Sequence, residues 1–314
     1  LILYSIRLGD LSQQDKRCVF LTVHDLGTNH TSMVDFVNSP AMLEIKERSC
    51  FIHVDVPGHE ENSPDLPDYP FPSLQTLGED MITVLDFLQV RYAVGLGEGA
   101  GANILARCGQ AHPRRLLGLI LVNCTASTSS VADAFRSRFS RWRGTDISQS
   151  EEDFLIYHKF GHVSFIPPEI LHYPEYRSRL RGNLNTHNIK QFVRAFIHRK
   201  DLILRGCRPD ILLITGMLSP YASVVEKMYK ELDKDKVTIL KIDKVGDVLA
   251  EAPAKVAQSL LLFCQGQGLL TSLPPPGVER RMSRAMSMEE YDKPNIRRLS
   301  LTPNVSESPP PRKV

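Results

Sequence analysis

The sequence lacks several features that would place it in a specialised class of proteins. Its longest apolar runs, residues 116–122 and 260–264, fall far short of the roughly 20 residues that span a bilayer as a helix. The formal net charge of +2 is too small to indicate a nucleic-acid-binding surface. The six cysteines are scattered, without a C-x-x-C pair or a Cys/His spacing typical of metal ligands. We therefore expect a protein of a reducing, cytoplasmic compartment that uses no metal or cofactor and binds no nucleic acid.

What is present is the composition of a globular protein with alternating strands and helices. Hydrophobic residues make up 42% and charged residues 24% of the 314 residues, so a core can form without disulfide or metal cross-links. Strand-like and helix-like patterns alternate as far as Asn123. The expected strands are residues 18–23, 50–54, 92–96 and 117–123, and the expected helices are 73–88 and 102–110. This alternation predicts an α/β protein whose mostly parallel sheet is flanked by helices on both faces.

The alternation stops after the fourth expected strand and later resumes. Residues 125–205 have mostly helical patterns, and strand-like runs return at 211–215 and 237–241. The interruption predicts a helical cap inserted over the carboxyl ends of the strands. Residues 274–314 hold eight of the 21 prolines and little aliphatic periodicity, which predicts a disordered tail. The predicted division is a first core part (1–124), the cap (125–205), a second core part (206–273) and the tail (274–314).

A glycine-rich turn follows the third expected strand. Residues 95–101, G-L-G-E-G-A-G, lie between a strand and a helix, as does the G-x-S-x-G nucleophile elbow of the α/β-hydrolase fold. We expect Gly97 at the nucleophile position, between Gly95 and Gly99. Glycine has no nucleophilic atom. The sequence therefore predicts an α/β-hydrolase fold whose elbow has lost its reactive group.

The other two members of a catalytic triad are also missing where the fold would place them. The acid should follow strand 211–215, where the chain has Met217. The base should follow strand 237–241, near Gly246 and Asp247, and no histidine occurs beyond His198. We therefore predict that the chain has no catalytic residues and is not an enzyme. The vestigial pocket is expected to be formed by His24, Asp25, Gly97, Glu98, Met217 and Asp247.

These motifs also allow two other interpretations. The glycine loop loosely fits the dinucleotide-binding G-x-G-x-x-A pattern, but two expected strands precede it and no acidic residue closes a following strand. The loops that contain His24-Asp25, His53-Asp55 and His59-Glu60-Glu61 contain groups suited to zinc or to acid–base chemistry. No short ligand spacing supports a metal, so we favour the simpler interpretation. In it His24 and Asp25 cap the first loop and the others are solvated.

Several further motifs occur in order along the chain: V-H-D-L-G-T-N-H (23–30), H-V-D-V-P-G (53–58), G-L-G-E-G-A-G-A-N-I-L (95–105), L-I-L-V-N (119–123), R-K-D-L (199–202), V-V-E (224–226) and Q-G-Q-G (265–268). Together and in this order they resemble the N-myc downstream-regulated protein family, a non-catalytic branch of the α/β hydrolases. The resemblance implies a divergent member, with Met217 where relatives have an acidic residue. It also implies non-enzymatic signalling in stress response, differentiation, growth control or trafficking, with phosphorylation of the tail.

The tail supports phosphorylation independently of that resemblance. Ser283, Ser287 and Ser300 each follow an arginine by three residues, the offset at which a basophilic Ser/Thr kinase can bind a basic side chain. Thr302 and Ser308 precede prolines and are weaker candidates. A phosphate adds about −1.5 to −2 charge and could recruit phosphoserine-binding adaptors. Residues 279–314 have a net charge of +3, so weak peripheral membrane association is expected, and phosphorylation should weaken it.

Three functions remain open from the sequence. The first is a non-catalytic adaptor or signalling protein that is regulated through its tail. The second is a small-molecule or lipid sensor that uses the vestigial pocket. The third is a cryptic hydrolase with a relocated nucleophile, for instance among residues 127–130.

Overall fold

The computed structural model describes residues 4–67, 70–127, 147–161 and 173–274. These residues form a seven-stranded sheet with the strand order β1-β3-β2-β4-β5-β6-β7. Only the edge strand β1 pairs antiparallel, and the six others are parallel. The strands are β1 (Tyr4–Leu8), β2 (Cys18–Val23), β3 (Ser49–Asp55), β4 (Ala93–Glu98), β5 (Leu116–Val122), β6 (Asp210–Gly216) and β7 (Val237–Ile242).

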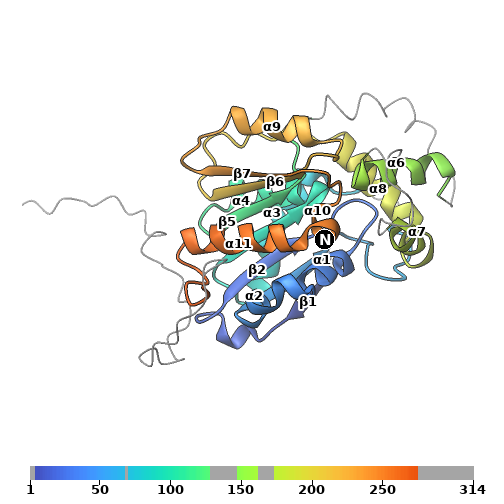
Figure 1. The fold of residues 1–314 in the computed structure, drawn as a ribbon. Coiled ribbons are helices and arrows are strands. Elements are labelled where there is room, and N and C mark those ends of the chain that lie inside the picture. The colour runs from blue at the N-terminus through green and yellow to red at the C-terminus, as the bar shows by residue number, and fades with distance from the viewer. Residues whose placement is uncertain (1–3, 68–69, 128–146, 162–172, 275–314) are drawn as a thin grey trace, which may run out of the picture.

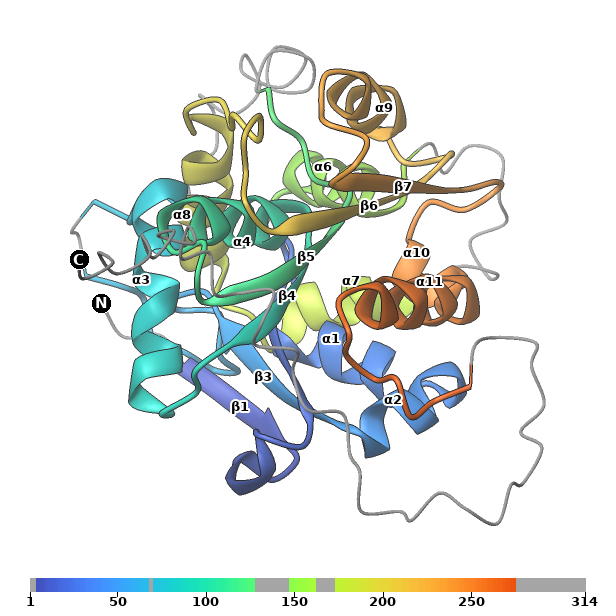
Figure 2. The same cartoon turned by 90° about the vertical axis from the view of Figure 1, so that its left-hand side faces the viewer.

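Helices cover both faces of the sheet, and the central strands are therefore buried on both sides. Along β2, Leu21 packs into one hydrophobic cluster and its neighbour Phe20 into the other. Figure 2 shows α3 and α4 on one face and α1, α2 and α11 on the other. The helices of the core, including two that were not named above, are α1 (His30–Val37), α2 (Leu43–Glu47), α3 (Leu74–Phe87), α4 (Gly99–Ala111), α9 (Ala222–Lys230), α10 (Val248–Glu251) and α11 (Pro253–Gly266). Two short 3-10 helices span Leu11–Gln13 and Pro40–Met42.

The described part of the insertion between β5 and β6 is helical. It contains α6 (Gln149–Phe160), α7 (Tyr173–Gly182) and α8 (Thr186–Ile197), which gather at one end of the sheet in Figure 1. Two acidic residues of α6 hold the three helices together: Glu152 forms ion pairs with Arg177 and Arg181 of α7, and Glu151 pairs with Lys190 of α8 at 3.2 Å. Both carboxylates and Lys190 are almost fully buried, whereas Arg177 and Arg181 reach the carboxylate of Glu152 from partly exposed positions.

The predicted fold class is confirmed: the sheet is mostly parallel, helices flank it, and a helical cap is inserted in the chain between β5 and β6. β1 and α1 were not anticipated, and β4 runs two residues further than predicted, to Glu98. The tail lies outside the described residues, and with it Ser283, Ser287, Ser300, Thr302 and Ser308. None of the helices in the described ranges is long and apolar enough to cross a membrane.

Candidate functional site

The strand–helix turn lies at Gly99, not at Gly97 as we predicted. Gly97 is inside β4 and pairs with Val23 and Leu121 on the neighbouring strands. Gly99 begins α4 with φ of +50°, a left-handed conformation that favours glycine, and it therefore occupies the apex of the sharp turn. The prediction was wrong by two residues because the elbow pattern fits equally well when it is centred on Gly97, between Gly95 and Gly99, or on Gly99, between Gly97 and Gly101.

The carboxylate of Asp25 fills the space in front of this apex. A Cβ atom added to Gly99 would overlap the Asp25 carboxylate, so the turn has no room for a side chain. Asp25 Oδ1 accepts a hydrogen bond from the Ala100 N–H at 2.8 Å. In hydrolases the N–H of the residue after the nucleophile forms part of the oxyanion hole. Asp25 therefore engages the donor that would stabilise an oxyanion.

His158, from the end of α6, holds the Asp25 carboxylate from the other side. Its Nε2–H donates to both carboxylate oxygens, at 3.0 and 2.9 Å, and its Nδ1 accepts from the Tyr221 hydroxyl. Burial would raise the pKa of Asp25, but His158, Lys159 and the Ala100 N–H together hold it below its usual value. Asp25 is therefore an ionised anchor for the cap at neutral pH.

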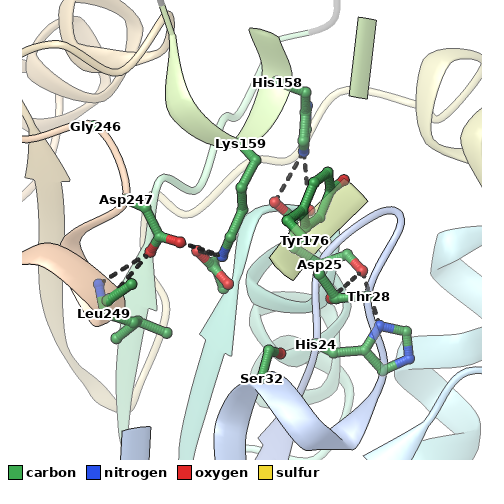
Figure 3. Close-up of polar contacts among 12 residues, drawn as sticks. His24, Asp25, Thr28, Ser32, His158, Lys159, Tyr176, Gly246, Asp247 and Leu249 are labelled. Carbon is green, nitrogen blue, oxygen red and sulfur yellow. Dashed lines mark hydrogen bonds and ion pairs between the residues drawn. The ribbon is translucent and has the colours of Figure 1, made fainter. Parts of the chain in front are cut away.

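Lys159, the next residue of α6, forms a second buried contact with the core. Its Nζ lies 2.5 Å from Glu98 Oε1 and 3.2 Å from Asp247 Oδ2. Figure 3 shows both side chains directed from α6 into the core, His158 towards Asp25 and Lys159 towards Asp247. Burial would lower the pKa of Lys159, but Asp247, Glu98 and Asp25 outweigh it and raise the pKa. Burial raises the pKa of Glu98 to about 8, although Lys159 opposes the shift.

The backbone at the C-terminal end of α6 also packs directly against the backbone of two core loops. A Cβ atom on Gly246 would overlap the carbonyl of Phe160, and one on Gly161 would overlap the carbonyl of Leu218. Gly161 has φ of +78°, which ends the helix and turns the chain away. Glycine at both positions allows the cap helix to approach the loops after β6 and β7 this closely.

These loops contain Met217 and Asp247, the residues near which we expected the acid and the base of a triad. Met217 follows β6 directly, its N–H donates to the Ile242 carbonyl, and its side chain is 39% exposed. Asp247 directly precedes α10 as its N-cap and accepts from the N–H groups of Leu249 and Ala250 at 3.2 and 3.3 Å. Asp247 therefore combines a helix cap with an ion pair to Lys159.

His53, Asp55 and His59 are buried, contrary to the solvation that we expected, whereas Glu61 is exposed and Glu60 is half-buried. His24 braces the first loop: its Nδ1–H donates to the Asp25 carbonyl, and its Nε2 accepts the Val56 N–H at 3.0 Å. Burial lowers the pKa of His53 to about 4 and that of His59 to about 3. In the described ranges, no group of three or more His, Cys, Asp or Glu side chains could hold a metal ion.

The six residues predicted to form the pocket do not enclose one cavity. Asp25, Glu98 and Asp247 come together, but the cap residues His158 and Lys159 fill the space between them. A cavity of about 470 Å³ lies beside this cluster, and Asp247 is the one predicted pocket residue among its described lining. His158, Lys159 and Tyr221 were not found from the sequence, because no local pattern distinguishes them from other helical polar residues.

The parallel sheet, the sharp glycine turn after β4 and the helical insertion before β6 define an α/β-hydrolase fold. Solved structures support it: an esterase from Thermogutta terrifontis has a TM-score of 0.65 at 17% identity over 84% of this chain and 93% of its own. A hydrolase from Pseudomonas aeruginosa has a TM-score of 0.64 at 20% identity over 83% and 93%. These likenesses concern the fold alone.

Residues 5–271 match the Ndr family. An uncharacterized protein of Caenorhabditis elegans is 40% identical over 300 residues, which cover 94% of this chain and 90% of that protein. Protein NDRG1-A of Xenopus laevis is 32% identical over 88% of this chain and 72% of its own length. The chain belongs to the Ndr family, as its motifs predicted. This membership supports a non-catalytic, Ndr-type role in general.

Proposed function

We propose that this chain is a non-enzymatic adaptor built on an inactive α/β-hydrolase scaffold. One observation carries the proposal: the Asp25 carboxylate occupies the space in front of Gly99 and binds the Ala100 N–H. A hydrolase needs a nucleophile at the position of Gly99 and a free N–H donor at the position of Ala100. Loss of a triad alone costs about 10⁶ in rate, or roughly 8 kcal/mol of transition-state stabilisation.

The buried Tyr221–His158–Asp25 chain of hydrogen bonds does not replace the triad. The order resembles a nucleophile, a base and an acid, but the Tyr221 side chain is 2% exposed. Burial raises the pKa of Tyr221 well above its usual value, so its hydroxyl stays protonated. A protonated, inaccessible hydroxyl cannot attack a substrate. The contacts instead favour a structural role, in which the cap is fixed to the core.

The purified chain is expected to show no esterase activity above the uncatalysed rate and no labelling by a fluorophosphonate probe. The measurements are hydrolysis of p-nitrophenyl acetate and gel fluorescence after probe treatment, with a serine hydrolase as the positive control. Labelling that disappears in a Ser127→Ala variant would show a relocated nucleophile and contradict the proposal. Ser129 and Ser130 lie outside the described residues and need the same substitution.

The adaptor part of the proposal depends on the tail, whose arginine-serine spacing suits a basophilic kinase. Treatment with such a kinase is expected to add phosphates at Ser283, Ser287 and Ser300, read by intact-mass and peptide mass spectrometry. The phosphorylated chain should bind a phosphoserine-binding domain, because each phosphate supplies charge and acceptor oxygens for arginine clusters. A triple serine-to-alanine variant should bind no better than the untreated chain. Ser306, without arginine at the same offset, is the internal control.

Family membership supports placing this adaptor in stress response, differentiation, growth control or trafficking. The +3 charge of the tail segment supports weak binding to anionic membranes.

A further inference from the structure

A cavity of about 470 Å³ lies between the core helices α1 and α10 and the cap helix α7. Pockets of roughly 300–1,000 Å³ are typical of small-molecule sites. It is separate from the filled catalytic position, since Asp25, Gly99 and Glu98 do not line it. It is reached from solvent past α1 and α7, whose residues Asp35 and Glu175 are exposed.

The inner wall of the cavity is largely apolar. It is formed by buried residues of α1, α6, α7, α10 and the connection before α8, namely Phe36, Phe160, Tyr176, Leu184 and Leu249. Three of the five are aromatic, and aromatic faces attract cations as well as apolar groups. The hydroxyl of Ser39, a lining residue, is buried without a hydrogen-bond partner among the described residues. The wall therefore suits an apolar body with few polar atoms.

The charged residues of the lining have an excess of carboxylates. At the entrance, Asp35, Glu61 and Glu175 face one cation, Arg179. Arg179 is already paired, with Asp35 at 2.8 Å and with Glu175 at 3.0 Å.

The second cation of the lining is neutralised at the base of the cavity. Lys159 is paired there with Asp247 and with Glu98 behind it. Among the described lining residues there are thus four carboxylates and two paired cations, and their field favours a positively charged ligand.

We propose that this cavity binds an amphipathic organic cation: an ammonium group at the carboxylate-rich entrance with a short apolar body against the aromatic inner wall. This function is additional to the adaptor role and does not depend on it. A carboxylate-bearing ligand of the same shape would meet like charges at the entrance, and a neutral one would gain only the apolar contacts.

Three probes of matched length separate the electrostatic contribution to binding from the apolar contribution: hexylammonium, hexan-1-ol and hexanoate. Isothermal titration at low ionic strength is expected to give about tenfold or more tighter binding for hexylammonium than for the other two, a difference that salt should reduce. Equal affinity for hexan-1-ol, tighter binding of hexanoate, or no binding of hexylammonium would each overturn the proposal.

Two pairs of variants locate the binding. Ala250→Trp places a large side chain in the cavity and should abolish binding, whereas Ala254→Trp, at an exposed position outside the lining, should leave it unchanged. Glu61→Gln should weaken hexylammonium binding about twofold to fivefold, the range for one exposed charge, and Glu231→Gln, at an exposed position directly after α9 and outside the lining, should not. Circular dichroism checks that each variant is folded. Undiminished binding to folded Ala250→Trp protein would contradict the site, whatever the esterase assays show.

Discussion

Replacing Lys159 with alanine is expected to lower the free energy of unfolding by about 3–5 kcal/mol, among the largest effects of any single substitution in this chain. Lys159 is 5% exposed, and it supplies the cation shared by the buried carboxylates Glu98 and Asp247. Removing it leaves two carboxylates in a water-poor site, where ionised groups are costly. One oxygen of Glu98, Oε2, already has no hydrogen-bond partner among the described residues, so no second donor can compensate.

Urea unfolding followed by circular dichroism measures this effect, and hydrogen exchange of the α6 amides locates it. Lys227→Ala, an exposed lysine of α9, is the matched control and should change stability by no more than about 0.5 kcal/mol. A triple variant with Lys159→Met, Glu98→Gln and Asp247→Asn removes the charges together and should recover a large part of the loss. A Lys159→Ala protein as stable as the Lys227→Ala protein would mean that the buried ion pairs do not fix the cap.

The core strands could be predicted because each is a short apolar run bounded by polar residues. β2 has the predicted bounds, and β3, β5, β6 and β7 differ from prediction by one residue at one or both ends. The end of β4 could not be placed, because Glu98 interrupts the apolar run although it is buried in the strand. A carboxyl group is accommodated there because Lys159, 61 residues away in sequence, lies beside it.

The candidate site was harder to predict than the fold because its partners come from distant segments. His24, Asp25 and Asp247 were chosen by their places at strand ends, and the structure places Asp25 and Asp247 in the cluster. The cap residues that complete it are 133 residues from Asp25 and 88 residues from Asp247. No local periodicity records a contact over such separations. A vacant elbow could be inferred from the sequence, but not that an aspartate and a cap helix fill it.

Restoring a nucleophile to the elbow is expected to destabilise the chain rather than activate it. Gly99→Ser places a side chain against the Asp25 carboxylate and imposes a left-handed backbone on a non-glycine residue. Overpacking and backbone strain each cost about 1–3 kcal/mol, so we expect a loss of roughly 3 kcal/mol or more. Thermal unfolding measures the loss, and hydrolysis of p-nitrophenyl acetate should stay at the uncatalysed rate, since Asp25 still binds the Ala100 N–H.

Two further variants separate the causes of this loss. Gly206 has φ of +79° with nothing within 4 Å of an added Cβ, so Gly206→Ser measures strain alone and should cost about 1 kcal/mol. Asp25→Gly combined with Gly99→Ser removes the overlap, but it also leaves His158 without its carboxylate partner, so only part of the stability should return. If Gly99→Ser were no less stable than Gly206→Ser, Asp25 would not occupy the elbow. The case for an obstructed catalytic position would then be lost, because a serine could enter it freely.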